Sequence, residues 1–132
     1  MHLEVYKKTI PASNEEVFSF LSDINNFEKL MPENIDTFEV LDEETFKFSL
    51  SGMPTIVLKK KEELPHSKIV LGAASDKLPF TLTANIDSLS ENSSEVNLSF
   101  EGEFNAMMAM MIKGPITKFM ETLTDNMQKI GQ

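Results

Sequence analysis

The sequence contains no cysteine, no arginine and no tryptophan. Without cysteine the chain forms no disulfide, has no thiol nucleophile and supplies no thiolate ligand for zinc or an iron–sulfur cluster. No apolar run approaches the roughly 18 residues of a membrane-spanning helix, and the opening MHLEVYKKT has no apolar core of signal-peptide length. We therefore expect a soluble cytoplasmic protein.

The absence of arginine means that lysine carries all of the positive charge. The 12 lysines face 21 acidic residues, which gives a net charge of −9. Phosphate recognition favours the forked guanidinium and needs a basic face. The only basic run, Lys59-Lys60-Lys61, is followed at once by Glu62-Glu63. We expect no nucleic-acid partner and no stable membrane insertion.

Glycine and histidine are also scarce. The five glycines form no Gly-x-Gly pattern, so a phosphate-binding loop is not expected. A metal site needs clustered ligands, whereas His2 and His66 are far apart in the sequence and are both expected on the solvated surface. The sequence predicts no metal, no cofactor and no catalytic residue.

The first third of the chain predicts one strand and two short helices. Residues 2–10 alternate between apolar and polar types, as in a strand, and Pro11 ends it. Ser13 and Glu16 fit a capping box, so a helix should begin at Asn14. A second short helical piece then runs up to Pro32.

From residue 36 to residue 104 the period-two pattern predicts about six further antiparallel strands. The pattern is clearest in 45–50, 80–87 and 95–100, where one face is apolar and the other polar. The turns are expected at 42–44, 51–54, 65–67, 75–77 and 90–93.

After residue 104 the period becomes helical. An apolar stripe of seven residues predicts one long amphipathic helix: Met108, Ile112, Ile116, Phe119, Leu123, Met127 and Ile130. Five of the nine methionines fall in this segment, and methionine suits a wall that must adapt its shape. Because proline cannot donate to the preceding turn, Pro115 predicts a kink or short break near Lys113 and Gly114.

Two segments resemble the START/Bet v 1-like (SRPBCC) superfamily. These are EVYKKTIPASNEEVFSFLSDINNFEKLMP near the start and Gly114-Pro115-Ile116 within the terminal helix. The resemblance covers essentially the whole chain and implies a single domain, 1–132, of the α+β class. The implied helix-grip fold is a strongly curved antiparallel sheet of about seven strands around a long C-terminal helix, with two short helices after the first strand.

The resemblance also implies a cavity between the sheet and the C-terminal helix. Together with the excess of Phe and Met, it predicts binding of a small hydrophobic or amphipathic ligand such as a lipid, a quinone or a polyketide-like molecule. Lys60 and Tyr6 are the candidate polar contacts. The predicted lining is Phe46, Phe48, Leu71, Phe80, Leu82, Leu98, Phe100, Met108, Met111 and Phe119, with Met31 and Met53 near the entrance.

Three alternatives remain open at this stage. In the first alternative, the chain is an enzyme of the polyketide cyclase or dehydratase type, which predicts inward polar residues such as Tyr6, Thr83 or Asn85. In the second, it is a ligand-free interaction module like the co-chaperone members of the superfamily, which predicts an exposed apolar patch. In the third, the methionines are ordinary core packing. The sequence does not distinguish a monomer from a dimer.

Overall fold

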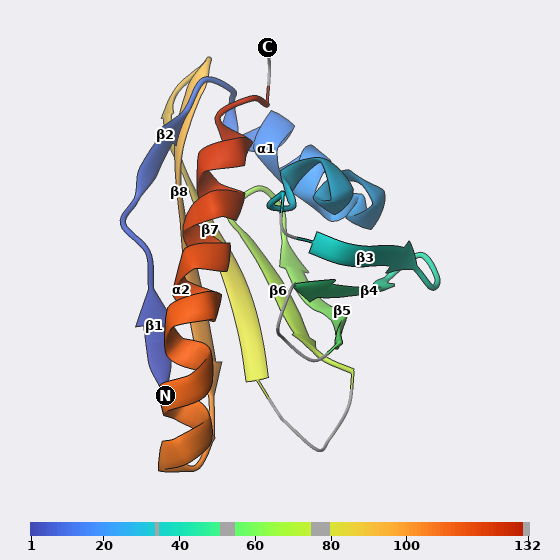
Figure 1. Cartoon of the computed structure of the whole chain (residues 1–132). Coiled ribbons are helices and arrows are strands. Elements are labelled where there is room, and N and C mark those ends of the chain that lie inside the picture. Colours follow the sequence, from blue (N-terminus) through green and yellow to red (C-terminus); the bar gives the residue numbers. More distant parts are fainter. Residues whose placement is uncertain (34, 51–54, 75–79, 131–132) are drawn as a thin grey trace.

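The computed structural model describes residues 1–33, 35–50, 55–74 and 80–130. In chain order the elements are β1 (His2–Glu4), β2 (Lys8–Ile10), α1 (Asn14–Ser22), the 3-10 helix η1 (Ile24–Leu30), β3 (Ile35–Val40), β4 (Thr45–Leu50), β5 (Ile56–Leu64), β6 (Lys68–Ala73), β7 (Phe80–Ser90), β8 (Ser93–Gly102) and α2 (Ala106–Met127). Figure 1 shows their arrangement.

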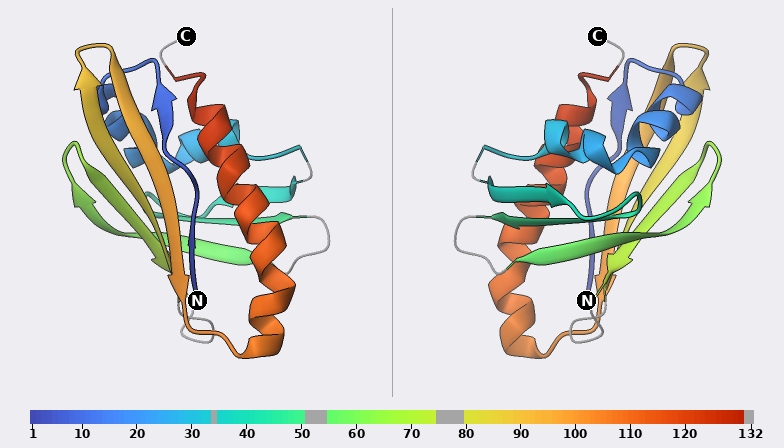
Figure 2. Two further views of the ribbon diagram at one scale, coloured as in Figure 1. Left: turned by 90° about the vertical axis from the view of Figure 1, so that its left-hand side faces the viewer. Right: turned by 90° about the vertical axis from the view of Figure 1, so that its right-hand side faces the viewer.

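The strands form one antiparallel sheet in the order β1-β8-β7-β6-β5-β4-β3, and β2 also pairs with β8. The sheet curls around α2, while α1 and η1 lie beside the C-terminal half of that helix (Figures 1 and 2). This arrangement confirms the predicted α+β helix-grip fold. Among the described residues, no helix is long and apolar enough to cross a membrane.

The predicted first strand is two strands, β1 and β2. Leu3 pairs with Phe100, whereas Lys8 pairs with Val96, so the register shifts by one residue between them. The extra residue in this bulge lets both Val5 and Ile10 face the core although they are five positions apart. The sheet therefore has eight strands where about seven were expected.

The helix α1 begins at Asn14, as the sequence predicts, and the second helical piece is η1, which ends shortly before Pro32. The Ser13 hydroxyl accepts a hydrogen bond from the backbone N–H of Glu16 at 3.1 Å, which caps α1. Asp23 caps η1 in the same way, through the backbone N–H of Asn25 at 3.0 Å. The apolar sides of both helices are buried against the sheet.

The apolar stripe of α2 faces the sheet, as predicted. From Ile116 onward its members are buried, whereas Met108 and Ile112 are only half-buried. Asn126 ties the second half of α2 to η1, because its side-chain amide donates to the carbonyl of Leu30 at 2.8 Å. The second half of α2 is thus fixed in the core, and the first half packs less closely.

The helix α2 is continuous through Pro115, so the break predicted near Lys113 and Gly114 is not found. Both Gly114 and Pro115 are exposed, and among the described residues no atom outside the adjacent helix backbone lies within 4 Å of where a side chain on Gly114 would start. Because this side of the helix faces solvent, water can replace the hydrogen bond that proline removes.

Candidate functional site

An apolar cavity of about 80 Å³ lies between the sheet and α2. Side chains from β4, β5, β7, β8, the segment after β8 and α2 line it, and no polar atom contributes to its wall. The lining residues are Phe48, Ile56, Leu58, Phe80, Leu82, Phe100, Phe104, Met108, Ile112, Ile116, Phe119 and Met120.

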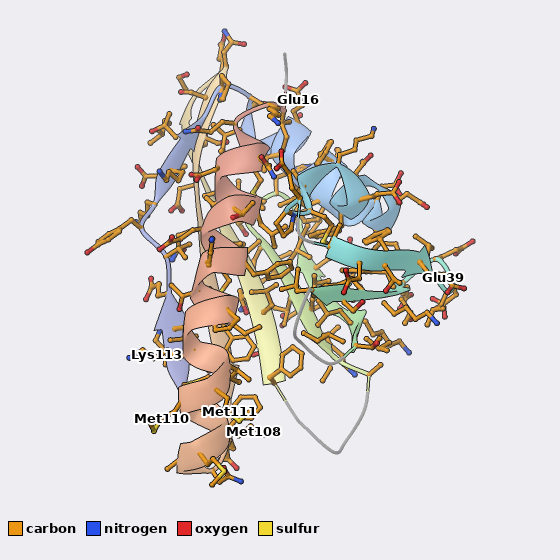
Figure 3. The ribbon with its side chains drawn as sticks, viewed as in Figure 1. Glu16, Glu39, Met108, Met110, Met111 and Lys113 are labelled. Atoms are coloured by element: carbon orange, nitrogen blue, oxygen red, sulfur yellow. The ribbon has the colours of Figure 1, made fainter. Side chains whose placement is uncertain are left out.

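The wall has a buried part and a half-exposed part. Seven of the lining residues are buried: Phe48, Leu58, Leu82, Phe100, Ile116, Phe119 and Met120. The other five are half-exposed and form what we call the rim: Ile56, Phe80, Phe104, Met108 and Ile112. Two rim residues come from the loosely packed first half of α2. Figure 3 shows Met108 there, on the side of the helix toward the sheet.

Aromatic rings stiffen both parts of the wall. The rings of Phe48 and Phe119 stack in the buried part, with centroids 4.9 Å apart and planes 13° apart. Nearer the rim, the ring centroid of Phe100 lies 5.1 Å from that of Phe80 and 6.0 Å from that of Phe104. Such pairs add stability beyond the area they bury.

Gly102 leaves room for Phe80 and Phe104, the two aromatic residues of the rim, to pack directly against the end of β8. A Cβ at this position would lie 2.5 Å from a ring carbon of Phe104 and 2.9 Å from the Cβ of Phe80. Phe104 immediately precedes Asn105, whose side chain accepts the backbone N–H of Met108 at 2.9 Å and so caps α2. The position of the Phe104 ring is therefore linked to the start of the helix.

Half of the residues predicted to line the site do lie on the cavity wall: Phe48, Phe80, Leu82, Phe100, Met108 and Phe119. Leu71 and Leu98 line a separate void of about 10 Å³, which is at the lower limit for a single water. Phe46 is buried between Phe27 and Phe48, and Met31 is half-buried beside the core. Met53 lies outside the described residues.

Three further predicted contacts lie away from the wall: Met111, Tyr6 and Lys60. Met111 is 69% exposed, because it sits beside the buried stripe of α2 and not within it. Tyr6 is 92% exposed in the bulge between β1 and β2. Lys60 turns toward α1, where its ammonium donates to the carbonyl of Ser22 at 3.0 Å and pairs with Glu63.

The cavity includes six residues that the sequence-based prediction left out: Ile56, Leu58, Phe104, Ile112, Ile116 and Met120. The helical stripe already contained Ile112 and Ile116, and alternation in β5 indicated Ile56 and Leu58. Phe104 has the same parity as the buried Phe100, but it lies beyond the end of β8, and its position depends on Gly102.

Replacing Lys60 by methionine is expected to lower the free energy of unfolding by about 1 kcal/mol, since a charge-assisted hydrogen bond to the end of α1 is lost. Urea denaturation measures this difference. Lys59→Met is the matched control, because Lys59 is exposed on the same strand. Equal stability of the two variants would contradict the structural role given to Lys60.

A larger groove of about 760 Å³ lies at the sheet end near β1, but it is open to solvent. Both charged and apolar residues line it: Met1, His2, Lys61, Gly72, Ala73, Phe80, Thr81, Glu101, Gly102 and Glu103. Because it does not enclose a ligand, we place the candidate site in the smaller apolar cavity.

His2 in this groove is an ion-pair partner and not a free surface imidazole. Its ring nitrogens lie 3.3 Å from a Glu4 oxygen and 3.0 Å from a Glu101 oxygen. These hydrogen bonds, that of Glu4 first, raise the pKa of His2 above its ordinary value of 6.5. Within the described residues no group of three or more His, Asp or Glu side chains could hold a metal ion.

An NMR titration should therefore find the pKa of His2 above 6.5, and Glu4→Gln should move it down. Because the folded-state pKa is raised, the contribution of this cluster to stability is present below the unfolded-state pKa. It is lost as the pH rises through the folded-state pKa. Glu15→Gln, on the exposed side of α1, serves as the control and should leave the His2 titration unchanged.

Comparison with solved structures finds the same fold in proteins of low sequence identity. Three of them are a START superfamily protein from Mycobacterium smegmatis, norcoclaurine synthase from Thalictrum flavum and an aromatase/cyclase from a Streptomyces species. Their TM-scores are 0.72, 0.76 and 0.74, and their sequence identities 14%, 10% and 12%. The alignments cover 96%, 98% and 97% of this chain and 94%, 86% and 91% of the other chains.

At such identities these similarities establish the START/Bet v 1-like helix-grip fold, and the fold does not specify a function. The norcoclaurine synthase was solved with dopamine and hydroxybenzaldehyde bound. No protein-family model matches the sequence, and comparison with curated proteins finds no match.

Proposed function

We propose that this protein binds a small hydrophobic or amphipathic molecule, such as a lipid, a quinone or a polyketide-like compound, between the sheet and α2. The observation that carries the proposal is a cavity whose wall consists entirely of apolar side chains. An apolar guest gains about 25 cal/mol for each Å² of surface that it removes from water. The cytoplasm is the proposed location, on the composition alone.

The size of the cavity implies that it enlarges when it binds. Its 80 Å³ is well below the roughly 300–1,000 Å³ of typical ligand sites. The rim and the first half of α2 are the parts able to move, since they are only half-buried, and Met108 can change rotamer at little cost. The buried wall around Phe48 and Phe119 forms the fixed floor.

The chemistry of the wall supports binding over catalysis. Thr83 and Asn85, which the enzyme alternative places inward, are half-buried on the side of β7 opposite the buried Leu82 and Ala84. Tyr6 is exposed. In the part of the chain that the structure describes, no polar group faces the cavity to transfer a proton, as acid–base catalysis requires.

Native mass spectrometry of protein purified from its own cells tests the proposal, together with thermal shifts induced by a panel of fatty acids and quinones. We expect a copurifying apolar molecule and a rise in melting temperature, because a ligand that binds only the native state stabilises it. Absence of both would contradict the proposal.

A rim variant makes the test specific to this cavity. Ile112→Trp places a large ring at the half-exposed rim and should abolish the ligand-induced thermal shift. Leu89→Trp is the matched control, since Leu89 is exposed on β7 and does not line the cavity. Loss of the shift in both variants would indicate binding elsewhere.

A further inference from the structure

The first turns of α2 expose three methionines, which we call the methionine triad: Met107, Met110 and Met111. Their side chains are 75%, 83% and 69% exposed, and none of them lines the apolar cavity. Methionine is ordinarily a buried residue. The other methionines that the structure describes are half-buried or buried: Met1, Met31, Met108, Met120 and Met127. Core packing therefore does not explain the methionine triad.

Helical spacing brings the three sulfur atoms within reach of one another. Residues at i, i+3 and i+4 are neighbours on a helix surface, with Cβ atoms about 5–6 Å apart. Met107 thus lies between Met110 and Met111, one turn nearer the start of α2. Side chains of a helix lean toward its N-terminus, so Met110 and Met111 lean toward Met107. Gly114 on the next turn agrees with this direction, because no described atom beyond the adjacent helix backbone lies within 4 Å of where its Cβ would be.

Only side-chain rotation is needed for the methionine triad to close on an ion. Figure 3 shows Met110 and Met111 on different sides of α2. Each side chain of the triad is exposed and has three rotatable bonds, so it changes rotamer without displacing a packed neighbour. The backbone beneath them is helical, and the side chain of Asn105 caps its start. The helix fixes the spacing of the ligands, and their flexible side chains allow the sulfur atoms to converge.

The chemistry of the side chains selects a soft metal ion. Thioether sulfur is neutral and polarizable and favours Cu(I), whereas carboxylates, carbonyls and water suit Mg²⁺ and Ca²⁺. The chain has no cysteine, so thioethers are its only soft ligands. Among the described residues no cluster of His, Asp or Glu could hold a metal ion. The prediction of no metal site rested on histidine and cysteine ligands, and thioethers are a separate class.

Charges of both signs surround the methionine triad. Glu103 precedes the helix, and Lys113 follows the triad, and both are exposed. The open hollow on the next turns also carries both signs, because Lys113, Lys118 and Glu121 all line it. The positive end of the helix dipole opposes a cation only weakly, and salt screens it. The type of ligand atom, and not the local charge, therefore determines which ion this surface binds.

We propose that Met107, Met110 and Met111 bind one Cu(I) ion through their three sulfur atoms. Because thioethers carry no charge, they hold Cu(I) less tightly than thiolates do. Because the triad is exposed, a further ligand from another molecule can reach the bound ion. The site therefore suits reversible binding and exchange of Cu(I). It is separate from the apolar cavity and does not rest on the proposed function.

Competition with the chromogenic chelator bicinchoninate tests the site in the whole protein, with ascorbate present and oxygen excluded. We expect the unchanged protein to withdraw one Cu(I) ion per chain from the chelator. Met107→Leu/Met110→Leu/Met111→Leu keeps apolar, helix-favouring side chains but removes the sulfur atoms, and should abolish this binding. Met31→Leu removes a half-buried thioether elsewhere and is the matched control. His2→Gln removes an exposed imidazole near the N-terminus, and both controls should bind as the unchanged protein does.

The redox-inert ion Ag(I), which is also soft and monovalent, identifies the ligands. In the NMR spectrum of protein with isotope-labelled methionine methyl groups, Ag(I) should shift the signals of Met107, Met110 and Met111. The signals of the buried Met120 and Met127 should stay in place. Zn²⁺ should shift none of the three, since it normally takes Cys, His or carboxylate ligands. Single Leu variants assign each signal.

The proposal is overturned if the triple Leu variant binds Cu(I) as tightly as the unchanged protein, or if His2→Gln abolishes the binding. It is equally overturned if Ag(I) leaves any signal of the methionine triad in place, or if Zn²⁺ shifts all three.

Thermal shifts with fatty acids separate this proposal from the proposed function. The triple Leu variant leaves the cavity wall intact and should keep those shifts. Cu(I) binding by a protein that shows no shift with fatty acids or quinones would contradict only the proposed function. A thermal shift without Cu(I) binding would contradict only the metal site.

Discussion

Phe119→Ala is expected to lower the free energy of unfolding by about 3–5 kcal/mol, the range for truncating a buried phenylalanine. Phe119 is 5% exposed, stacks on Phe48 and lines the cavity. Its loss removes an aromatic pair and enlarges an existing void, which the surrounding wall can fill only in part. Because domains of this size are stable by about 5–15 kcal/mol, guanidinium denaturation should show a large shift of the midpoint.

Phe20→Ala is the control for Phe119→Ala. Phe20 is only half-buried at the surface of α1, with Lys29 near its ring, so the same truncation should cost far less. The enlarged cavity also makes a functional prediction, because apolar cavities of about 150 Å³ bind benzene. Benzene should raise the melting temperature of Phe119→Ala more than that of the unchanged protein. An equal response would mean that the void has collapsed.

Gly102→Ala is expected to lower the free energy of unfolding by about 2–3 kcal/mol, a cost typical of inserting a methyl group into packed side chains. The new Cβ would meet the Phe104 ring at 2.5 Å and the Cβ of Phe80 at 2.9 Å, distances that real contacts do not reach. Phe104 must move, and the rim opens with it. The binding rate of an apolar ligand should therefore rise while stability falls, as stopped-flow fluorescence and urea denaturation would show.

A double-mutant cycle identifies the contact responsible. If Phe104 is the side chain displaced, Gly102→Ala should cost less in a Phe104→Ala background, and the two effects should be clearly non-additive. Gly114→Ala is the control, since the residue is exposed in α2 and its new Cβ would have open space on the side away from the helix backbone, as far as the structure describes the chain. Additive effects of Gly102→Ala and Phe104→Ala would argue against the proposed role of Phe104 at the rim.

The elements of the fold follow from local patterns. Alternation in β4, β7 and β8 and the apolar stripe of α2 are properties of neighbouring residues, and Ser13 caps α1 through a contact only three residues away. These local preferences predict the elements correctly because each one is consistent with the sheet or helix that the residues form in the folded protein. The bulge between Glu4 and Lys8 has no comparable signal, since it depends on the register against β8.

The residues that line the cavity could be predicted only in part from the sequence. Residues on an inward face, such as Phe100 and Phe119, could be named from periodicity. Alternation alone does not distinguish Leu82, which lines the cavity, from Leu98, which lines only the separate void. That difference depends on how far α2 lies from each strand, and side chains distant in sequence set this separation.

The sequence by itself determined the helix-grip fold and the apolar character of its interior. Only the tertiary structure decided that the cavity is as small as 80 Å³, that Lys60 contacts α1 and not the cavity, and that Met107, Met110 and Met111 are exposed. The physical reason is range. Periodicity and capping act within a few residues, whereas cavity volume and exposure depend on packing between segments that meet only when the chain folds.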